Sequence, residues 1–469
     1  MMAKGTVAEG LYDVAIVGGG VVGCAVARRF ALEGARTILL ERAADILAGP
    51  SKANSALLHT GFDAIPGSLE LACVRAGYAE YLEIRERMNL PLLETGAVLV
   101  AWDEEETARL GAILAQAHAN GVTDVRHMGR EELLGREPCL STRARDAILV
   151  PGEHVIDPWS APLAYLRQAV ENGAQALFSA PVEGGKFDGV AWSLATPRGA
   201  VTASLVINCA GLWGDRLDQA LLGRSDFTIR PRKGQFAVFD KAAAPYLRSI
   251  LLPVPTERTK GVVLGRTIFG NLLVGPTAEE QTDRERPFTD GATLAKLVEH
   301  AARLIPALAG MAVTAAYAGL RPASEHKDYR IRAYADRDWI TVGGIRSTGL
   351  TGALGIARHV WSLYEGLGRR HQPLGAPAWP RMPNIADHLA RDFHEPGYGE
   401  IVCHCEMVTR REIEAALTGP LPAGDLGGLK RRTRAMMGRC QGFYCGARVC
   451  AIAQGRLAIP GDMARPLHD

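Results

Sequence analysis

The chain lacks any marked imbalance of charge. Among its 469 residues, 53 are Lys or Arg and 51 are Asp or Glu, which gives a formal net charge of +2. Proteins that bind nucleic acid or anionic membranes over a broad surface usually carry a clear basic excess. The balance therefore argues against nucleic acid as a partner. The apolar content of 47% and the charged content of 22% are ordinary for a globular protein.

Long apolar runs are also absent. The first apolar stretch, VAIVGGGVVGCAVA at residues 14–27, is crowded with glycine and too short to cross a membrane. It has neither the Leu-rich core nor the cleavage site of a secretory signal. We therefore expect a cytoplasmic protein with reduced thiols, which reaches the inner face of the membrane only through a partner. A chain of this length is too long to fold around one hydrophobic core, which predicts two or three domains.

Glycine, by contrast, is abundant, and three glycines form a motif. A β-branched run at 13–17 predicts a strand, and Gly18, Gly20 and Gly23 follow as G-x-G-x-x-G at the start of a helical pattern. The second strand, RTILLE, closes with Glu41. In a dinucleotide site these glycines permit a tight turn, close approach of a pyrophosphate and close helix–strand packing, while the acid binds ribose hydroxyls. A glycine-rich structural turn is the alternative.

Two later segments repeat the strand–turn–helix pattern. They are LVINCAGLWGDRL at 205–217 and WITVGGIRSTGLTGALGIARHVWSLY at 339–364. A unit so far downstream indicates that the end of the chain completes the nucleotide-binding domain. The glycine motif alone does not distinguish NAD from FAD.

Together these segments resemble the FAD-dependent oxidoreductases of the D-amino-acid oxidase and glycerol-3-phosphate dehydrogenase superfamily, over roughly residues 11–370. The resemblance implies an α/β fold, with a Rossmann-like FAD-binding domain interleaved with an α+β substrate domain. In that family the pyrophosphate meets the first glycine loop and the isoalloxazine meets the last. The residues expected at FAD are Gly18, Gly20, Gly23, Glu41, Arg42, Ser51, Asn54, Ser55, Gly211, Gly344, Gly349, Leu350 and Thr351.

The same resemblance suggests three catalytic residues. His59 in LLHTG matches the family's LLHSG, which implies a role as the base that takes the substrate's hydroxyl proton, or as a ring against the flavin. Arg321 in AYAGLRP matches AYSGVRP and would bind an anionic substrate through its planar fork. Lys233 in PRKGQF would line the same pocket. Without the resemblance, a core histidine and two surface cations remain the alternatives.

One departure from the family leaves the substrate open. Glycerol-3-phosphate enzymes continue HSGARY, whereas this chain has HTGFDA with Phe62 and Asp63. We interpret the acid as a hindrance to a phosphate dianion. The alternatives are a 2-hydroxy-acid dehydrogenase, for example for 2-hydroxyglutarate, or an amine or opine dehydrogenase. A further alternative is an electron-transfer subunit without a substrate of its own.

Cysteine is sparse, but four of the nine cysteines cluster near the end of the chain. Cys403 and Cys405 form C-x-C, and Cys440 and Cys445 form C-x4-C. Clustered cysteines in a reducing compartment favour metal or redox chemistry over disulfides. Structural zinc sites usually use C-x2–4-C pairs, so C-x-C favours a [2Fe–2S] cluster held by four thiolates. Zinc, or a tail that is only structural, are the alternatives.

This tail resembles the bacterioferritin-associated ferredoxin-like [2Fe–2S] domain. It is closer still to the tail of the anaerobic glycerol-3-phosphate dehydrogenase large subunit, through VCHCE, KRRTR and CQGFYC. The basic run is expected to offset the negative charge of the cluster. Thr409 with Glu412, and Asp425, are predicted to begin two helices.

The sequence thus predicts four regions. They are a discontinuous FAD-binding domain at 1–80, 150–225 and 325–370, a substrate domain at 81–149 and 226–324, a Pro-rich linker at 371–397 and a small helical [2Fe–2S] domain at 398–469. The expected activity is oxidation of a small anionic alcohol, with glycerol-3-phosphate as the best match, by hydride transfer to flavin N5. Electrons would then leave through the cluster to a partner protein or a quinone-linked membrane partner.

Overall fold

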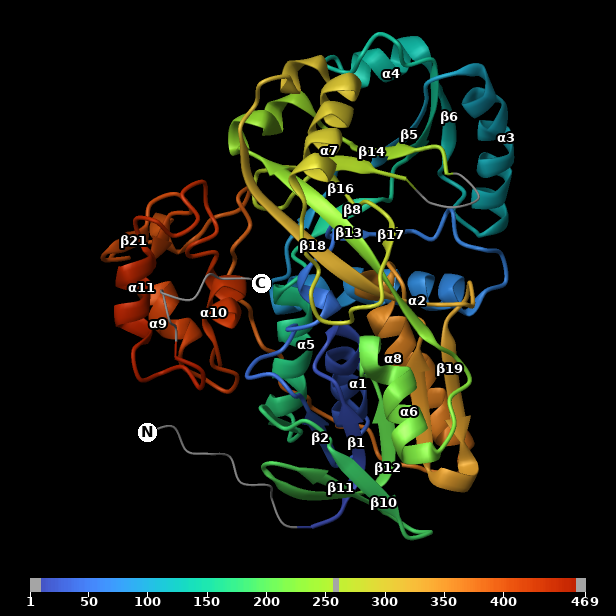
Figure 1. Ribbon diagram of the computed structural model, residues 1–469, viewed down its shortest axis with the longest axis vertical. Helices are drawn as coiled ribbons and strands as arrows, with labels where there is room; N and C mark the ends of the chain where they lie inside the picture. The colour runs from blue at the N-terminus through green and yellow to red at the C-terminus, as the bar shows by residue number, and fades with distance from the viewer. Residues whose placement is uncertain (1–9, 256–260, 461–469) are drawn as a thin grey trace.

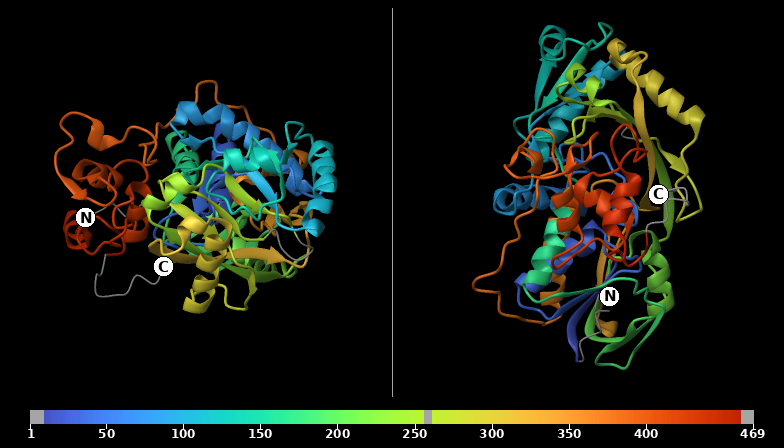
Figure 2. Two further views of the ribbon diagram at one scale, coloured as in Figure 1. Left: turned by 90° about the horizontal axis from the view of Figure 1, so that it is seen from above. Right: turned by 90° about the vertical axis from the view of Figure 1, so that its left-hand side faces the viewer.

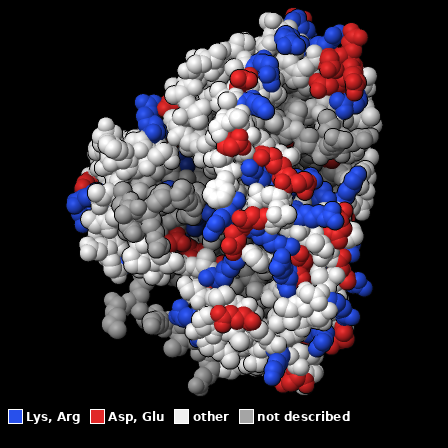
Figure 3. All heavy atoms as spheres, in the orientation of Figure 1, with Lys and Arg blue, Asp and Glu red and all other residues white. Residues whose placement is uncertain are grey.

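The computed structural model describes residues 10–255 and 261–460. A main body carries two large sheets, one above the other, and the C-terminal residues form a small domain at its side (Figure 1). The left view of Figure 2 again shows this small domain beside the body, and in the right view it lies in front of the body. Basic and acidic side chains are interspersed over the face seen in Figure 3, as expected for a nearly neutral chain.

The lower sheet has the order β10-β11-β12-β1-β2-β9, with β20 beside β12 and β19 beside β20. Its strands are β1 (Tyr12–Val17), β2 (Thr37–Leu40), β9 (Gln175–Leu177), β10 (Gly184–Phe187), β11 (Trp192–Thr196), β12 (Gly199–Asn208), β19 (Arg330–Tyr334) and β20 (Trp339–Gly343). Strand β1 lies parallel to both β2 and β12, and β12 lies parallel to β20. The three glycine-rich segments are therefore neighbours in one sheet, and the predicted α/β, Rossmann-like fold is confirmed.

Helices pack on this sheet, and several of them begin at the turns that follow its strands. They are α1 (Val21–Leu32), α2 (Leu69–Met88), α5 (Ser160–Glu171), α6 (Gly214–Leu222) and α8 (Gly349–Gly366). Phe30 of α1 packs edge-on against Trp361 and Tyr364 of α8, with ring centroids 4.9 and 5.0 Å apart. Helix α1 also lies so close to its own turn that a β carbon on Gly23 would stand 1.9 Å from the Gly18 carbonyl oxygen.

The upper sheet has the order β17-β13-β16-β15-β14-β5-β7-β6, with β18 also beside β13. Its strands are β5 (Ala97–Ala101), β6 (Arg126–Gly129), β7 (Asp146–Val150), β13 (Ile229–Phe239), β14 (Ile250–Pro253), β15 (Val263–Arg266), β16 (Leu272–Gly275), β17 (Glu279–Glu280) and β18 (Val313–Ser324). The long antiparallel pair β13–β18 descends toward the lower sheet (Figure 1). It brings Lys233 and Arg321 to the junction of the two halves.

Three helices and a small sheet complete the body. The helices are α3 (Glu104–Ala119), α4 (Arg130–Arg136) and α7 (Gly291–Leu304), and the small sheet joins β3 (Leu57–Leu58), β8 (His154–Ile156) and β4 (Leu92–Leu93). The alternation between the two large sheets follows the predicted interleaving. The domain boundaries remain predictions. The predicted domains include residues 1–9, 256–260 and 461–469, which lie outside the described residues.

The prolines after α8 produce an extended segment, because closely spaced prolines cannot continue a helix. Residues 367–391 contain no helix or strand, and they run back along the body. Leu374 N–H donates to the Leu32 carbonyl at 2.9 Å, and Met382 N–H donates to the Met88 carbonyl at 2.9 Å. This linker is therefore attached to the body through backbone hydrogen bonds.

The C-terminal domain contains β21 (Ile401–Cys403), β22 (Val408–Thr409), α9 (Arg410–Ala416), α10 (Leu426–Thr433) and α11 (Gly446–Ala453). The predicted capping box is confirmed, since Thr409 Oγ1 accepts from Glu412 N–H at 3.1 Å and Glu412 accepts in return at 2.7 Å. Asp425 caps α10 through Gly428 N–H at 2.6 Å. Helix α10 ends at Thr433, because Arg434 adopts a left-handed conformation with φ of 69°.

This small domain is attached to the segment that follows β2. Arg432 forms a buried, bidentate ion pair with Asp45, at 2.6 and 2.8 Å. Gly424 N–H donates to the same carboxylate at 3.0 Å, and Arg431 donates to the Ile46 carbonyl at 3.0 Å. The basic run was expected to offset the charge of a cluster. In the structure, two of its arginines bind the main body instead.

No helix within residues 10–255 and 261–460 is long and apolar enough to span a membrane.

The close approach at Gly23 yields a prediction for stability. Substituting Gly23→Ala forces α1 away from the turn, so we expect unfolding to be favoured by about 1–3 kcal/mol or more and bound flavin to be lost. Gly111→Ala is the matched control, because Gly111 lies in α3 with nothing within 4 Å of an added β carbon. Melting temperature and flavin absorbance per chain measure both effects. Full flavin content in Gly23→Ala would contradict this explanation.

Candidate functional site

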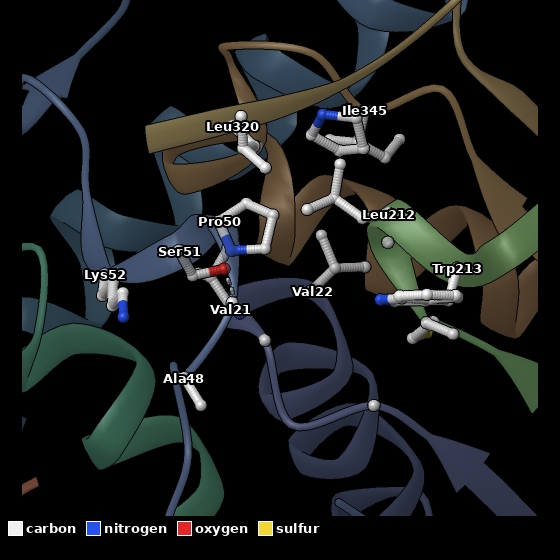
Figure 4. Close-up of a pocket in the computed structure, with 18 of the residues that line it drawn as sticks. Val21, Val22, Ala48, Pro50, Ser51, Lys52, Leu212, Trp213, Leu320 and Ile345 are labelled. Carbon is white, nitrogen blue, oxygen red and sulfur yellow. Dashed lines mark hydrogen bonds between the residues drawn. The ribbon is translucent and has the colours of Figure 1, made fainter. Parts of the chain in front are cut away.

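A cavity of about 930 Å³ lies between the two sheets. It runs from the first glycine turn at Gly18 and Gly20, past Glu41, to Gly234 and Arg321 on the pair β13–β18. Figure 4 shows side chains from several distant segments converging on it. Its volume is typical of sites for large cofactors.

The glycine end has the features of a phosphate site. Gly18 has φ of +113°, and a β carbon there would stand 2.5 Å from the Cys209 carbonyl oxygen. Helix α1 begins directly at the cavity, and Val21 N–H donates to Ser51 Oγ at 3.1 Å (Figure 4). Amides at a helix N-terminus attract anions through their partial positive charge. The residues present thus fit the pyrophosphate of a dinucleotide.

Glu41 shapes this turn as well as lining the cavity. One carboxylate oxygen accepts from Gly19 N–H at 2.5 Å, and the other accepts from Ala43 N–H at 2.8 Å. Burial raises the pKa of Glu41, and these amides oppose that shift. Both carboxylate oxygens of Glu41 are thus engaged by the backbone. The predicted contact of Glu41 with ribose stays a prediction.

The cavity wall includes most of the residues predicted at FAD. They are Gly18, Gly20, Glu41, Arg42, Ser51, Asn54, Ser55, Gly211, Gly349 and Leu350. Gly23, Gly344 and Thr351 lie outside the wall: Gly23 packs α1 against its turn, Gly344 adopts φ of +68°, and Thr351 is buried behind Leu350.

Trp213 is a cavity residue that sequence reasoning missed. The Arg42 guanidinium lies 5.2 Å from the centre of the Trp213 ring, and Arg42 also pairs with Glu285 at 3.6 Å. The tryptophan stands in the predicted segment at 205–217, but nothing in its spacing indicated which way the ring would point. Figure 4 shows it at the edge of the cavity.

His59 lies outside the cavity wall and is held by a buried acid. Its Nδ1 is 2.9 Å from Glu153 Oε2, and the Glu153 side chain is fully buried. Glu153 Oε1 also accepts from Thr60 N–H at 2.6 Å, while His59 N–H donates to Thr351 Oγ1 at 3.0 Å. Sequence reasoning missed Glu153, because it precedes the short strand β8 and carries no local motif.

Arg321 lies in the wall with its guanidinium oriented by the backbone. Its Nη2 donates to the carbonyls of Thr277 at 2.6 Å and Lys233 at 3.1 Å. Burial lowers the pKa of Arg321 to about 10, and the neighbouring Arg232 adds to this shift. A guanidinium that has lost water in this way gains from binding an anion.

A second arginine joins Arg321 in the wall. Arg346 comes from the loop before α8, and its Nη2 donates to the carbonyls of His326 and, at 3.4 Å, Ser324. Burial, and secondarily Arg232, lower the pKa of Arg346. Sequence reasoning missed this residue although it lies in the segment at 339–364. The end of the cavity away from the glycine turn is therefore doubly cationic.

Lys233 is not part of the wall. Its Nζ forms an ion pair with Glu279 at 3.0 Å and donates to the Phe288 carbonyl at 3.1 Å. The neighbouring Gly234 lines the cavity in its place.

The four clustered cysteines pair thiol to thiol within the C-terminal domain. Cys405 faces Cys440, and Cys445 faces Cys403. Burial, followed by the neighbouring Cys403, raises the pKa of Cys445 to about 12. The N–H groups of Tyr444, Gly442 and Phe443 point at the Cys440 sulfur and lower its pKa. Soft thiols surrounded by backbone N–H donors fit an anionic iron–sulfur cluster.

No three His, Cys, Asp or Glu side chains among the described residues are arranged as the ligands of a metal ion.

Two parts of the chain match known protein families. Residues 13–363 match the family described as FAD dependent oxidoreductase. The chain belongs to this family. Residues 401–454 match the BFD-like [2Fe-2S] binding domain, which spans all four clustered cysteines.

Two relatives resemble the chain over nearly its whole length. The chain is 31% identical over 458 residues to the glycerol 3-phosphate dehydrogenase of Caloramator mitchellensis, covering 96% of this chain and 95% of that protein. It is 26% identical over 500 residues to one subunit of the anaerobic glycerol-3-phosphate dehydrogenase of Escherichia coli (strain K12), covering 94% and 88%.

A solved structure has the same fold as the main body. It is dithionite-reduced L-alpha-glycerophosphate oxidase from Mycoplasma pneumoniae with FAD bound, with a TM-score of 0.73 and 28% identity, covering 80% of this chain and all of that one. The expectations of an FAD-dependent oxidoreductase and of two cofactors, FAD and a [2Fe–2S] cluster, are confirmed. Zinc, which the cysteine spacing alone left open, finds no support.

The cysteine assignment is testable by metal content. Cys405→Ser and Cys440→Ser each remove one thiolate ligand, so we expect both variants to lose the cluster and keep FAD. Cys450→Ser is the matched control, because Cys450 lies in α11 of the same domain and outside the four. Iron, acid-labile sulfide and flavin are measured per chain. A full complement of iron in Cys440→Ser would exclude that residue as a ligand.

Proposed function

We propose that the protein oxidises glycerol-3-phosphate and passes the electrons through its [2Fe–2S] domain to an acceptor protein. The observation that carries the proposal is the pair Arg321 and Arg346 in the wall of the cavity, at the end away from the glycine turn. Relatives named glycerol 3-phosphate dehydrogenase span almost the whole chain, including the cluster domain. FAD, when bound, supplies the acceptor for a hydride at its N5 atom.

The two arginines bind the anionic end of the substrate. Carbonyl oxygens fix the plane of the Arg321 guanidinium, so little side-chain entropy is lost when an anion binds. A phosphate dianion would interact with both positive charges in a site largely removed from water, where each interaction is strengthened.

His59 removes the hydroxyl proton, with Glu153 as its positioning residue. The buried carboxylate accepts from Nδ1–H, which leaves Nε2 as the proton acceptor. The backbone N–H of His59 donates to Thr351, which directly follows Leu350 of the cavity wall, so His59 is held close to that wall.

The departure at HTGFDA does not oppose a phosphate in this fold. Phe62 is 2% exposed in the core, and Asn120, directly after helix α3, donates to the carbonyls of Gly61 and Ala64, at 3.0 and 2.8 Å. Neither Phe62 nor Asp63 lines the cavity. The expected repulsion of a phosphate by Asp63 therefore loses its basis.

The cluster domain supports the choice of acceptor. Since a [2Fe–2S] cluster exchanges one electron at a time, the acceptor is a redox protein or a quinone-linked membrane partner. The protein acts in the cytoplasm, or at the inner face of the membrane through that partner.

Anaerobic titration of the flavin band tests the substrate. Glycerol-3-phosphate should bleach the flavin, and 2-hydroxyglutarate, lactate, glycine, proline and an opine should not. Bleaching by a carboxylate alone would replace the proposal with a 2-hydroxy-acid or amine dehydrogenase. An unchanged spectrum with all of them would favour a subunit that only relays electrons.

Arg321 should control substrate affinity. Arg321→Lys keeps a charge but loses the planar fork, so we expect KM to rise about 10- to 100-fold, with a smaller change in kcat. Because the charge of Arg321 is lost as pH rises through its pKa of about 10, affinity for the anion should fall above that pH. Arg230→Lys is the control, because Arg230 is exposed on strand β13, which pairs with the strand β18 that carries Arg321. Equal KM values for both variants would remove Arg321 from the site.

Glu153 should act only through His59. Glu153→Gln keeps an acceptor for Thr60 N–H but weakens the hold on the imidazole, so we expect kcat to fall about 100-fold with the flavin still bound. The double variant with His59→Ala should be no slower than His59→Ala alone. Additive losses in flavin-reduction rate would show that the two residues act independently.

A further inference from the structure

Two aromatic rings stack at the junction between the main body and the cluster domain. Trp159 directly precedes α5, and Phe269 lies in the turn between β15 and β16. Their ring centroids are 5.1 Å apart and their planes differ by 15°. Phe269 is 6% exposed. We call this pair the aromatic bridge; neither ring lines the cavity described above.

On one side the aromatic bridge reaches the wall of the cavity. The Trp159 indole N–H donates to the Lys52 carbonyl at 3.1 Å, and Lys52 lies in that wall (Figure 4). Buried Asp157 accepts from the backbone N–H of Trp159 at 2.9 Å and from Ser160 N–H at 3.1 Å. These bonds fix the position from which the indole side chain projects.

On the other side the aromatic bridge reaches the cysteines. Arg434 Cζ lies 4.1 Å from the centre of the Phe269 ring and 5.9 Å from that of Trp159. Arg434 pairs with Glu406 at 3.3 Å, and both side chains are buried. Glu406 directly follows Cys405 in the chain. Contacts therefore run without a break from Cys405 through Arg434 and the two rings to Lys52.

We propose that the aromatic bridge is the path by which electrons pass from the flavin cavity to the cluster. Electron tunnelling is more efficient through bonds and tight contacts than across gaps, and delocalised rings conduct better than saturated side chains. The other contacts between the domains described above, such as Arg432 with Asp45, contain no aromatic ring.

The electron count balances in two steps. The reduced flavin gives one electron to the cluster, whose Fe(III)–Fe(III) pair becomes Fe(III)–Fe(II), and the second electron follows when the first has left for an oxidised acceptor protein. The protons of the flavin pass to solvent, and no bond to the bridge forms. The inference needs the two cofactors of the proposed function but not its substrate.

The test follows electron transfer within the anaerobic holoenzyme. A light flash in the presence of EDTA reduces the bound flavin itself, and the cluster absorbance then reports the arriving electron. We expect Trp159→Leu to slow cluster reduction about tenfold or more, a rate ratio that corresponds to about 1.4 kcal/mol. Trp159→Phe, which keeps a ring, should stay near the wild-type rate. A failure of glycerol-3-phosphate as substrate would not affect this measurement.

Trp379→Leu is the matched control. This linker tryptophan also contacts an arginine, with Arg87 Cζ at 4.1 Å, but it lies away from the cysteines. Iron content, cluster midpoint potential and protease cleavage of the linker should match the wild type in Trp159→Leu. Wild-type cluster reduction in Trp159→Leu would overturn the proposal. Equal slowing in Trp159→Leu and Trp159→Phe, with faster linker cleavage, would also overturn it and show a contact that only docks the domain.

Discussion

The buried ion pair between Asp45 and Arg432 determines how the main body and the C-terminal domain of this protein meet. Both side chains are nearly inaccessible, and their two hydrogen bonds offset the loss of hydration. Close packing reinforces the pair, because a β carbon at Gly428 would stand 1.7 Å from the Asp45 carboxylate. Removing one partner would leave an uncompensated charge at a cost of about 3–5 kcal/mol. The cluster domain is thereby held beside the segment that also supports the first glycine turn, through Leu47 N–H and the Gly19 carbonyl at 3.0 Å.

This attachment gives the cavity two different neighbours. At one end, β13 and β18 bring two arginines from the upper half, which suit an anionic substrate. Along one side, the path through Trp159 and Phe269 reaches the cysteine domain. The cavity thus has an end that suits hydride removal from an anionic substrate and a side that faces the domain suited to single-electron exit. Both features depend on the positions of the two sheets and of the small domain.

Much of the framework could be predicted from the sequence, because its signals are local. The glycine turn, the capping box at Thr409 and Glu412, the extended proline segment and the paired cysteines each express a short-range rule of backbone geometry or ligand spacing. The discontinuous FAD fold followed from family resemblance rather than from periodicity. Fold and cofactors were confirmed, whereas the domain boundaries and the roles of His59, Arg321 and Lys233 remain predictions.

The missed residues act across long separations in the chain. Glu153 meets His59, and Trp159 meets Phe269, only because different strands and turns bring them together. The basic run at 430–434 read as countercharge for a cluster, yet Arg432 is committed to Asp45, a partner far away in the sequence. From the sequence, the Asp63 carboxylate was expected to hinder the binding of a phosphate. In the structure, the turn that carries Asp63 packs toward α3, and Asp63 does not line the cavity. Such assignments require the fold, since no spacing rule encodes them.

Electron flow from substrate to cluster is tested most directly by rapid-freeze paramagnetic resonance after anaerobic mixing of the holoenzyme with glycerol-3-phosphate. We predict that the signal of a reduced [2Fe–2S] cluster grows in after the flavin band bleaches. A bleached flavin beside a cluster that stays oxidised would contradict the electron exit. An unbleached flavin would contradict the substrate.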